Sequence, residues 1–268
     1  MVERHRRPKP TIIPPIVVTP PTVVTPPPPA TPPATGVVYL FQDEFDGAAG
    51  TGPDPTKWVF DTGGPGSFGN NELETYVDSL ANCFVDGDSV LHLRALNPSA
   101  GKYTSARIKT LGKFSHYGRT WESRIKWPTQ DGFWPAWWMM GSNPDQWPAS
   151  GEVDIFEVYG NGWAPGSTVW TPNSAATAME SSQSADFVND GDWHTWRFFY
   201  DEPGTGNMIF HKDGVLYLTA TPGPGWCYSN GNPLYTLLNL AVGGSGGGAV
   251  PAGAEFPVDL LVDYVRCW

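Results

Sequence analysis

Short apolar runs separated by turn residues fill the chain from Val37 onward, and this feature limits the folds it can adopt. Runs such as SVLHLRAL, SARIKT and HTWRFFYD are rich in Val, Ile, Leu and aromatic residues, and several alternate polar with apolar side chains. Almost none repeats at the 3.6-residue period of a helix. The turn pairs Asp86-Gly87 and Asp213-Gly214 favour hairpins. The pattern predicts an all-β domain of two stacked antiparallel sheets.

The N-terminal segment has a different composition from the rest of the chain. Residues 8 to 35 hold 12 of the 28 prolines, mixed with Thr, Val and Ile, and carry no charge beyond Lys9. Such a tract favours extended polyproline II and cannot bury a core. Its basic start contains no uninterrupted apolar stretch, so it is not an intact signal peptide. We expect residues 1–36 to be a disordered Pro/Thr-rich linker or stalk and residues 37–268 to form one domain.

Charge and aromatic content narrow the class of binding partner. The net charge is −11, which disfavours nucleic acid and anionic membranes as partners. The sequence holds no run of 18 or more apolar residues, so it predicts no membrane-spanning segment. The 13 tryptophans exceed what packing usually requires, and exposed indole rings bind the flat faces of sugars. A neutral polymer is therefore the kind of partner that the composition allows.

The three cysteines, Cys83, Cys227 and Cys267, show no CxxC spacing and no accompanying histidine cluster. This pattern argues against a zinc site. One disulfide is compatible with the sequence in any of three pairings, and one cysteine would remain unpaired. A domain of about 230 residues buries enough apolar surface to fold without a disulfide.

Three carboxylates interrupt the otherwise apolar run GEVDIFEVYG. Residues two apart on a strand share a face, so Glu152 and Asp154 point the same way while the apolar residues between them point to the core. Glu157 has the opposite parity, and a β-bulge at Ile155 or Phe156 would return it to the carboxylate face. The alternative is a solvated strand face without function, although exposed strand faces rarely use acids alone.

Paired carboxyl groups are what glycoside hydrolysis needs. One carboxylate attacks the anomeric carbon, and one protonated acid gives its proton to the leaving oxygen. Repulsion and hydrogen bonding among three close carboxyl groups should keep one proton in the cluster near neutral pH. The run therefore predicts a catalytic strand.

The pattern ExDxxE in GEVDIFE resembles the signature of glycoside hydrolase family 16, in the bulged form of laminarinases. Further segments resemble that family in the same order along residues 37–268: DEFDG, NNELETY, YTSARIKT, YGRTWESRIKWP, GFWPAWWMMG, LLNLAVGG and VDYVRCW. The resemblance implies a β-jelly-roll sandwich of two curved antiparallel sheets with a concave substrate cleft. It also implies hydrolysis with retention, with Glu152 as nucleophile, Asp154 as its electrostatic partner and Glu157 as general acid and base.

The same resemblance implies contacts to the substrate. Aromatic side chains should line sugar subsites and polar ones should bind sugar hydroxyls, which gives the set Trp134, Trp138, Asn70, Asn71, Arg107 and Glu122. Trp137 should alternate to the core, and the asparagines are equally suited to capping a turn. Trp170 lies where the family often has a histidine. The resemblance therefore does not predict the contacts on the leaving-group side of the cleft or the preferred glucan linkage.

Many members of the family hold one structural calcium ion away from the cleft, and Glu44, Gly87 and Asp263 match its ligands. Oxygen ligands of this kind suit calcium; the alternative is that Glu44 and Asp263 are exposed strand acids. Catalysis itself needs no cofactor.

The leading hypothesis is a secreted, extracellular and monomeric endo-β-1,3-glucanase that the N-terminal stalk tethers, with mixed β-1,3-1,4-glucan as a further candidate substrate. Three alternatives stay open. The chain would act on another polymer, as agarases, carrageenases and galactanases do; it would transfer the glycosyl group to a sugar; or it would bind glucan without cleaving it.

Overall fold

The computed structural model describes most of the chain beyond the N-terminal segment. Residues 1–35 of the predicted stalk, as well as Cys227, lie outside the described residues, which are 36–143, 147, 150–160, 165–170, 178–182, 187–202, 204–221 and 231–268. Within those ranges, no helix combines the length and the apolar character needed to cross a membrane.

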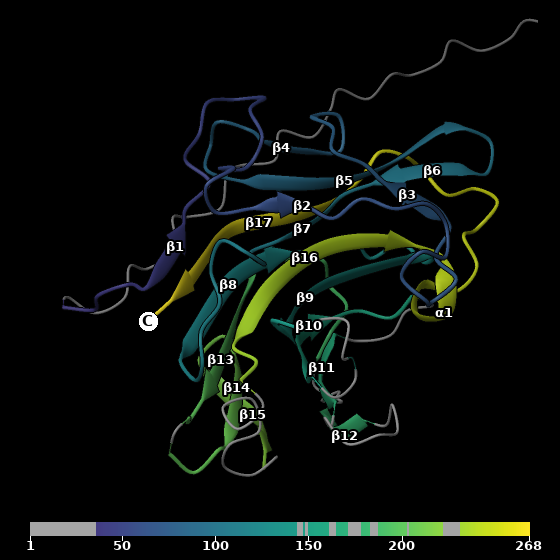
Figure 1. The fold of residues 1–268 in the computed structure, drawn as a ribbon. Coiled ribbons are helices and arrows are strands. Elements are labelled where there is room, and N and C mark those ends of the chain that lie inside the picture. Colours follow the sequence, from purple (N-terminus) through teal and green to yellow (C-terminus); the bar gives the residue numbers. More distant parts are fainter. Residues whose placement is uncertain are drawn as a thin grey trace, which may run out of the picture.

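Two β-sheets packed face to face form the protein (Figure 1). The larger sheet runs in the order β15 (Val215–Ala220), β14 (Met208–Lys212), β13 (His194–Tyr200), β8 (Thr120–Lys126), β17 (Val258–Cys267), β5 (Leu91–Ser99), β6 (Lys102–Ser105) and β3 (Glu74–Tyr76), with β1 (Phe41–Asp43) beside β17 and β4 (Cys83–Val85) beside β5. The smaller sheet runs in the order β12 (Ala178–Ser182), β11 (Gly166–Trp170), β10 (Glu152–Glu157), β9 (Phe133–Gly141), β16 (Leu234–Val242), β7 (Arg107–Lys109) and β2 (Val59–Phe60). One helical turn, α1 (Gly244–Gly247), follows β16.

The predicted all-β sandwich is confirmed, with one difference in strand direction. Both predicted hairpins form: Asp213-Gly214 joins β14 to β15, and Asp86-Gly87 lies between β4 and β5. Asp213 and Gly214 both have positive φ, as a tight hairpin turn requires. The pairing of β3 with β6 is parallel, whereas the other paired strands described are antiparallel. In Figure 1 the long strand β16 bows across the smaller sheet.

Alternating burial along the strands builds the core between the sheets. In β17 and β5 every second residue is buried over most of the strand, as the period of two predicts. Large aromatic side chains fill the space between the sheets, and they include Trp121, Trp196 and Trp137, each 2% exposed or less. All nine residues of β16 are buried, because one face packs in the core and the other lies under the cleft described below. Trp137 is therefore a core residue, as predicted.

Two of the three cysteines lie in this core. Cys83 and Cys267 are fully buried, and neither forms a disulfide with another described residue. Burial raises the pKa of the Cys267 thiol to about 12. The pairing of Cys83 with Cys267 is thus absent, and pairings with Cys227 lie outside the described residues.

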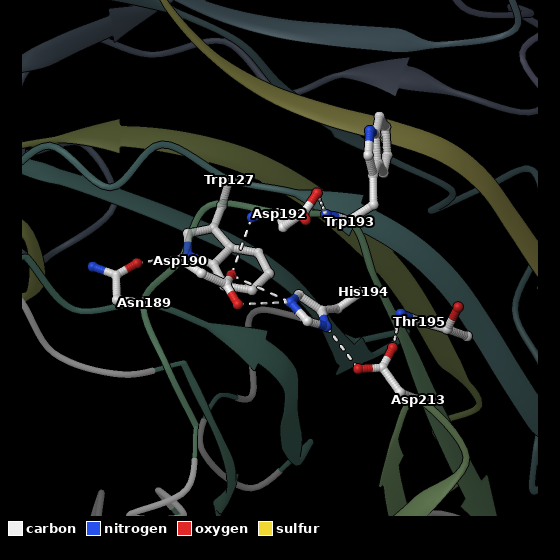
Figure 2. A network of polar contacts seen from close by, with 8 residues as sticks. All are labelled: Trp127, Asn189, Asp190, Asp192, Trp193, His194, Thr195 and Asp213. Carbon is white, nitrogen blue, oxygen red and sulfur yellow. Dashed lines mark hydrogen bonds and ion pairs between the residues drawn. The ribbon is translucent and has the colours of Figure 1, made fainter. Parts of the chain in front are cut away.

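A polar network joins the segment before β13 to the turn between β14 and β15 (Figure 2). His194 lies between two carboxylates, with Nδ1 at 2.6 Å from Asp213 and Nε2 at 3.2 Å from Asp190. Beside it, the indole of Trp127 donates a hydrogen bond to Asn189 at 2.7 Å. The network holds the end of the larger sheet in place.

Candidate active site

A β-bulge interrupts strand β10 between its carboxylates. Against β9, Asp154 pairs with Trp138 and Phe156 pairs with Trp137, so Ile155 is an extra residue on β10. The register against β11 shifts over the same stretch. The predicted bulge is confirmed, and it lies at Ile155.

The bulge changes the parity of the strand after Ile155. Ile155 and Phe156 are consecutive, and both are fully buried in the core. Glu157 therefore returns to the same side as Glu152 and Asp154, and all three line one cleft of about 560 Å³. The structure brings together the three carboxylates that the sequence predicted.

Glu157 is held by two aromatic donors. Its side chain is 6% exposed and accepts a hydrogen bond from Nε1 of Trp134 at 2.7 Å. The hydroxyl of Tyr159 also hydrogen-bonds to this carboxyl. Burial raises the pKa of Glu157 well above that of an ordinary glutamate, although both hydrogen bonds lower it. A carboxyl in this setting keeps its proton near neutral pH.

Glu152 has a different electrostatic environment. Its carboxylate accepts a hydrogen bond from Nε1 of Trp147 at 2.6 Å. Burial raises its pKa and the bond from Trp147 lowers it; the charge of Glu157 raises the pKa further, whereas the positive charge of Arg107 lowers it. Burial raises the pKa of both glutamates to about 7, so the pair retains a proton near neutral pH. The site can therefore hold one ionised and one protonated carboxyl at the same time.

Arg107 reaches the cleft in a prepared orientation. Its guanidinium carbon lies 4.2 Å from the ring centre of Phe68 and 4.8 Å from that of Trp138. Its Nε donates a hydrogen bond to Asp61 at 3.0 Å. Trp138 is fixed in turn, since its Nε1 donates to Oδ1 of Asn239 at 2.7 Å. Both predicted residues, Arg107 and Trp138, line the cleft.

The two predicted asparagines have different positions. Asn70 lines the cleft, and its backbone N–H and side-chain amide donate to the carboxylate of Glu72 at 3.2 and 3.3 Å. Asn71 is exposed, has a φ of 60° and is absent from the described cleft lining. The sugar contact of Asn71 therefore stays a prediction, whereas Asn70 lines the cleft.

The prediction that Glu122 contacts the substrate is wrong. Glu122 lies on β8 of the larger sheet, where Trp121 and Ile125 face the core and Glu122 takes the opposite, outer face. Its carboxylate accepts hydrogen bonds from Nε of Arg197 at 2.7 Å and from the hydroxyl of Tyr264 at 2.9 Å. The sandwich core separates it from the cleft, so its role is structural.

The residues predicted to bind calcium do not fit that ion. Both carboxylate oxygens of Glu44 are held by Arg266, at 2.8 and 2.7 Å, and Asp263 accepts a bond from Arg124 at 2.8 Å. Two guanidinium groups thus bind both carboxylate oxygens of Glu44 and one of Asp263. The described part of the chain contains no group of three or more His, Cys, Asp or Glu side chains suited to a metal ion.

Sequence reasoning missed several cleft residues. Tyr159 follows Glu157 by two positions, so strand periodicity alone indicated that it shares the carboxylate face. Glu72 lies in the segment NNELETY, where no local pattern distinguishes it from its neighbours, whereas Trp147 and Phe68 come from loops whose path no local pattern predicts. The side chain of Trp170 lies outside the described part of the structure, so the leaving-group side of the cleft stays a prediction.

A β-sandwich whose cleft holds two glutamates of one bulged strand beside indole rings provides the carboxyl pair that a glycoside hydrolase uses. Sequence comparison leads to the same class. The profile described as "XgeA-like, catalytic GH16 domain" matches residues 74–195, which include the bulged strand. Together with the relatives described next, this match shows that the chain belongs to glycoside hydrolase family 16.

Two curated relatives support this assignment at similar identity. The glucan endo-1,3-beta-glucosidase A1 of Niallia circulans is 32% identical over 270 residues, which cover 87% of this chain but only 38% of the relative. The beta-glucanase of Rhodothermus marinus is 32% identical over 252 residues, covering 85% of this chain and 84% of the relative. The chain thus spans well under half of one relative and most of the other.

A solved structure extends the comparison to three dimensions. The immunostimulatory antigen and pseudo beta-1,3-glucanase of Mycobacterium tuberculosis is 36% identical, with a TM-score of 0.72. The match covers 86% of this chain and 98% of that one. The fold is therefore shared with a protein described as a pseudo-enzyme, and function has to be argued from the cleft residues.

Proposed function

We propose that this chain is a retaining endo-β-1,3-glucanase. The observation that carries the proposal is the carboxyl pair of Glu152 and Glu157, which the bulge at Ile155 brings to one face of β10 in a cleft lined by indole rings. The names of the two curated relatives support a glucan as the substrate, and one of them supports the β-1,3 linkage.

In the proposed reaction Glu152 is the nucleophile and Glu157 the general acid, as the family resemblance implies. The carboxylate of Glu152 attacks the anomeric carbon and forms a glycosyl ester, while Glu157 protonates the departing glycosidic oxygen. Glu157, now ionised, takes a proton from water, and the resulting hydroxide displaces Glu152 from the same anomeric carbon. Two inversions give net retention. Asp154 adds negative charge on the side of Glu152, which favours the cationic transition state.

The charge of the cleft supports a neutral polymer. Four carboxylates line the described cleft, namely Glu72, Glu152, Asp154 and Glu157, against the one guanidinium of Arg107. Arg107 is already paired with Asp61 at 3.0 Å. A sulfated or uronate-bearing polysaccharide would place its charges against this negative surface. An uncharged glucan avoids that repulsion.

Location is a separate proposal. An endo-acting hydrolase of this kind meets its polymer outside the cell, so we propose that the protein is exported and that residues 1–36 act as a tether. The polyproline character of that segment supports a spacer role.

The decisive experiment is digestion of laminarin, with mixed-linkage glucan and agarose alongside. We expect short β-1,3-oligosaccharides from laminarin that are initially β-anomers by NMR. Glu152→Gln should lose more than about 10³-fold in kcat and still bind laminarin, because the nucleophile alone is removed. The Asp131→Asn variant, altered on an exposed loop, serves as the control.

Each outcome has a distinct meaning. Products from agarose alone would overturn the proposed substrate, and α-anomers would overturn retention. Binding of laminarin without any cleavage by the wild type would assign the chain to glucan recognition; its mycobacterial structural relative is itself described as a pseudo beta-1,3-glucanase.

A further inference from the structure

A glycine-rich turn, residues 243–248, contributes Ser245 and Gly246 to the cleft lining and is hydrogen-bonded to three other segments. The N–H of Ser245 donates to the carbonyl of Asn70 at 2.8 Å, and the N–H of Gly160, just after the catalytic strand, donates to the carbonyl of Gly246 at 2.8 Å. The N–H of Gly243 donates to the carbonyl of Gly132, just before β9, at 2.8 Å. The backbone of this turn is therefore fixed relative to β9 and to the catalytic strand β10.

Gly246 lies directly against the indole of Trp134. A Cβ atom built on Gly246 would be 2.3 Å from Cδ2 and 2.4 Å from Cε2 of that ring, closer than real Cβ atoms come to a neighbour. The ring of Tyr159 also packs on Trp134, with centroids 5.6 Å apart and planes at 30°. The indole is thus confined by the backbone of the turn and by an aromatic neighbour.

This confined indole makes the 2.7 Å hydrogen bond to Glu157. An ordinary contact of about 3.4 Å or more would require the ring to shift by roughly 1 Å if residue 246 carried a side chain, and a hydrogen bond lengthened by that amount is lost. The absence of a side chain at position 246 is therefore a geometric condition for the contact between Trp134 and the acid.

We infer that Gly246 is a positioning residue for the proposed reaction: by leaving room for the indole of Trp134, the turn keeps that indole's N–H on the general acid Glu157. Trp134 then contributes to the acid as well as to the sugar contact predicted from the sequence. The inference rests on the proposed function for its kinetic consequence, whereas its structural content is independent of any substrate.

The first test needs no substrate. In protein with ¹⁵N-labelled tryptophan, the indole N–H resonance of Trp134, assigned by its loss in Trp134→Phe, should move as Glu157 titrates and should stop doing so in Glu157→Gln. Gly246→Ala should abolish this pH response. Gly253→Ala is the matched control, because a Cβ there meets no atom within 4 Å. A Trp134 resonance that titrates unchanged in Gly246→Ala would overturn the inference.

The second test is the pH profile of laminarin hydrolysis. The hydrogen bond from Trp134 lowers the pKa of Glu157, so its loss should move the basic limb of kcat to higher pH and reduce kcat about 10-fold or more. Gly246→Ala should cost less than 2-fold when added to Trp134→Phe, because both act through one contact. Full additivity, or a lower kcat with an unmoved basic limb, would refute a role through Trp134.

A second variant covers the case in which Gly246→Ala does not fold, and the NMR titration covers the case of an inactive wild type. If Gly246→Ala does not fold, Ser245→Ala removes the 3.0 Å bond from its hydroxyl to Asn70 and should shift the basic limb in the same direction by a smaller amount; no shift there would count against the inference. A wild type that cleaves no glucan would contradict the proposed function. The NMR titration would still decide whether Gly246 positions Trp134 on Glu157.

Discussion

Replacing Glu122 with glutamine should destabilise the protein and leave its affinity for substrate unchanged. The carboxylate is buried at 7% side-chain exposure and joins three strands, since it accepts from Arg197 on β13 and from Tyr264 on β17. Glutamine keeps the shape but removes the charge, and its NH₂ group would face one of two donors. One hydrogen bond is therefore lost and the other is weakened.

The size of the effect follows from the exposure of each partner. A hydrogen bond to a charged group contributes about 1.5–3 kcal/mol. Arg197 is 44% exposed and water can replace its lost partner, so its pair with Glu122 contributes less than about 1 kcal/mol to stability, as exposed ion pairs do. The buried hydroxyl of Tyr264 cannot recover a partner as easily, which adds about 1–2 kcal/mol. We expect a loss of about 2 kcal/mol, or roughly 4–8 °C in Tm for a domain of this size.

Thermal unfolding and laminarin kinetics at 25 °C separate the two possible roles. The structural role predicts the lower Tm with KM within 2-fold of wild type, and the exposed-loop variant Asp131→Asn should leave both unchanged. A KM raised 10-fold or more at an unchanged Tm would refute the reasoning, because it would mean that Glu122 reaches the substrate.

Two further predictions concern pH and metal. Burial lowers the pKa of His194, but its hydrogen bond and ion pair with Asp213 outweigh burial, so the net pKa is raised; the stabilisation is full below about pH 6.5 and is lost as pH rises through the folded pKa. Urea unfolding should show that the free energy of unfolding of the wild type falls between pH 6 and pH 8.5, and that this fall is absent in His194→Gln. An equal fall in both proteins would contradict this. Because Arg266 and Arg124 bind the carboxylates of Glu44 and Asp263, EDTA should leave Tm unchanged. A drop of several degrees in Tm would instead support a bound calcium ion.

Local patterns predicted the parts of the site that lie on one strand. The alternation in GEVDIFE placed Glu152 and Asp154 on one face, and the wrong parity of Glu157 already required a bulge, which the structure has at Ile155. Trp137 followed from the same alternation. These inferences succeeded because side-chain direction along a strand depends only on sequence spacing and on bulges.

Residues on other strands were harder to place, because their position depends on which sheet each strand joins. Glu122 occupies an acidic position much like that of Glu152 in a strand of similar pattern, yet β8 pairs with β13 and β17 in the larger sheet. The alternation along β8 indicates that Glu122 faces away from the core, but not which side of the sandwich that is. Loop residues such as Trp147 carry no periodic signal at all.

The all-β class, the strand that carries the acids and the need for a bulge within it could be read from the sequence, since these depend on neighbours in the chain. The raised pKa of both glutamates, the entry of Asn70 into the cleft and the confinement of the indole of Trp134 by a glycine turn depend on the folded structure. Those features arise where β9, β10 and β16 meet the turn 243–248 and the loop that carries Asn70. The pKa of a buried carboxyl and the orientation of an indole depend on atoms brought together from distant parts of the chain, and only the folded packing specifies them.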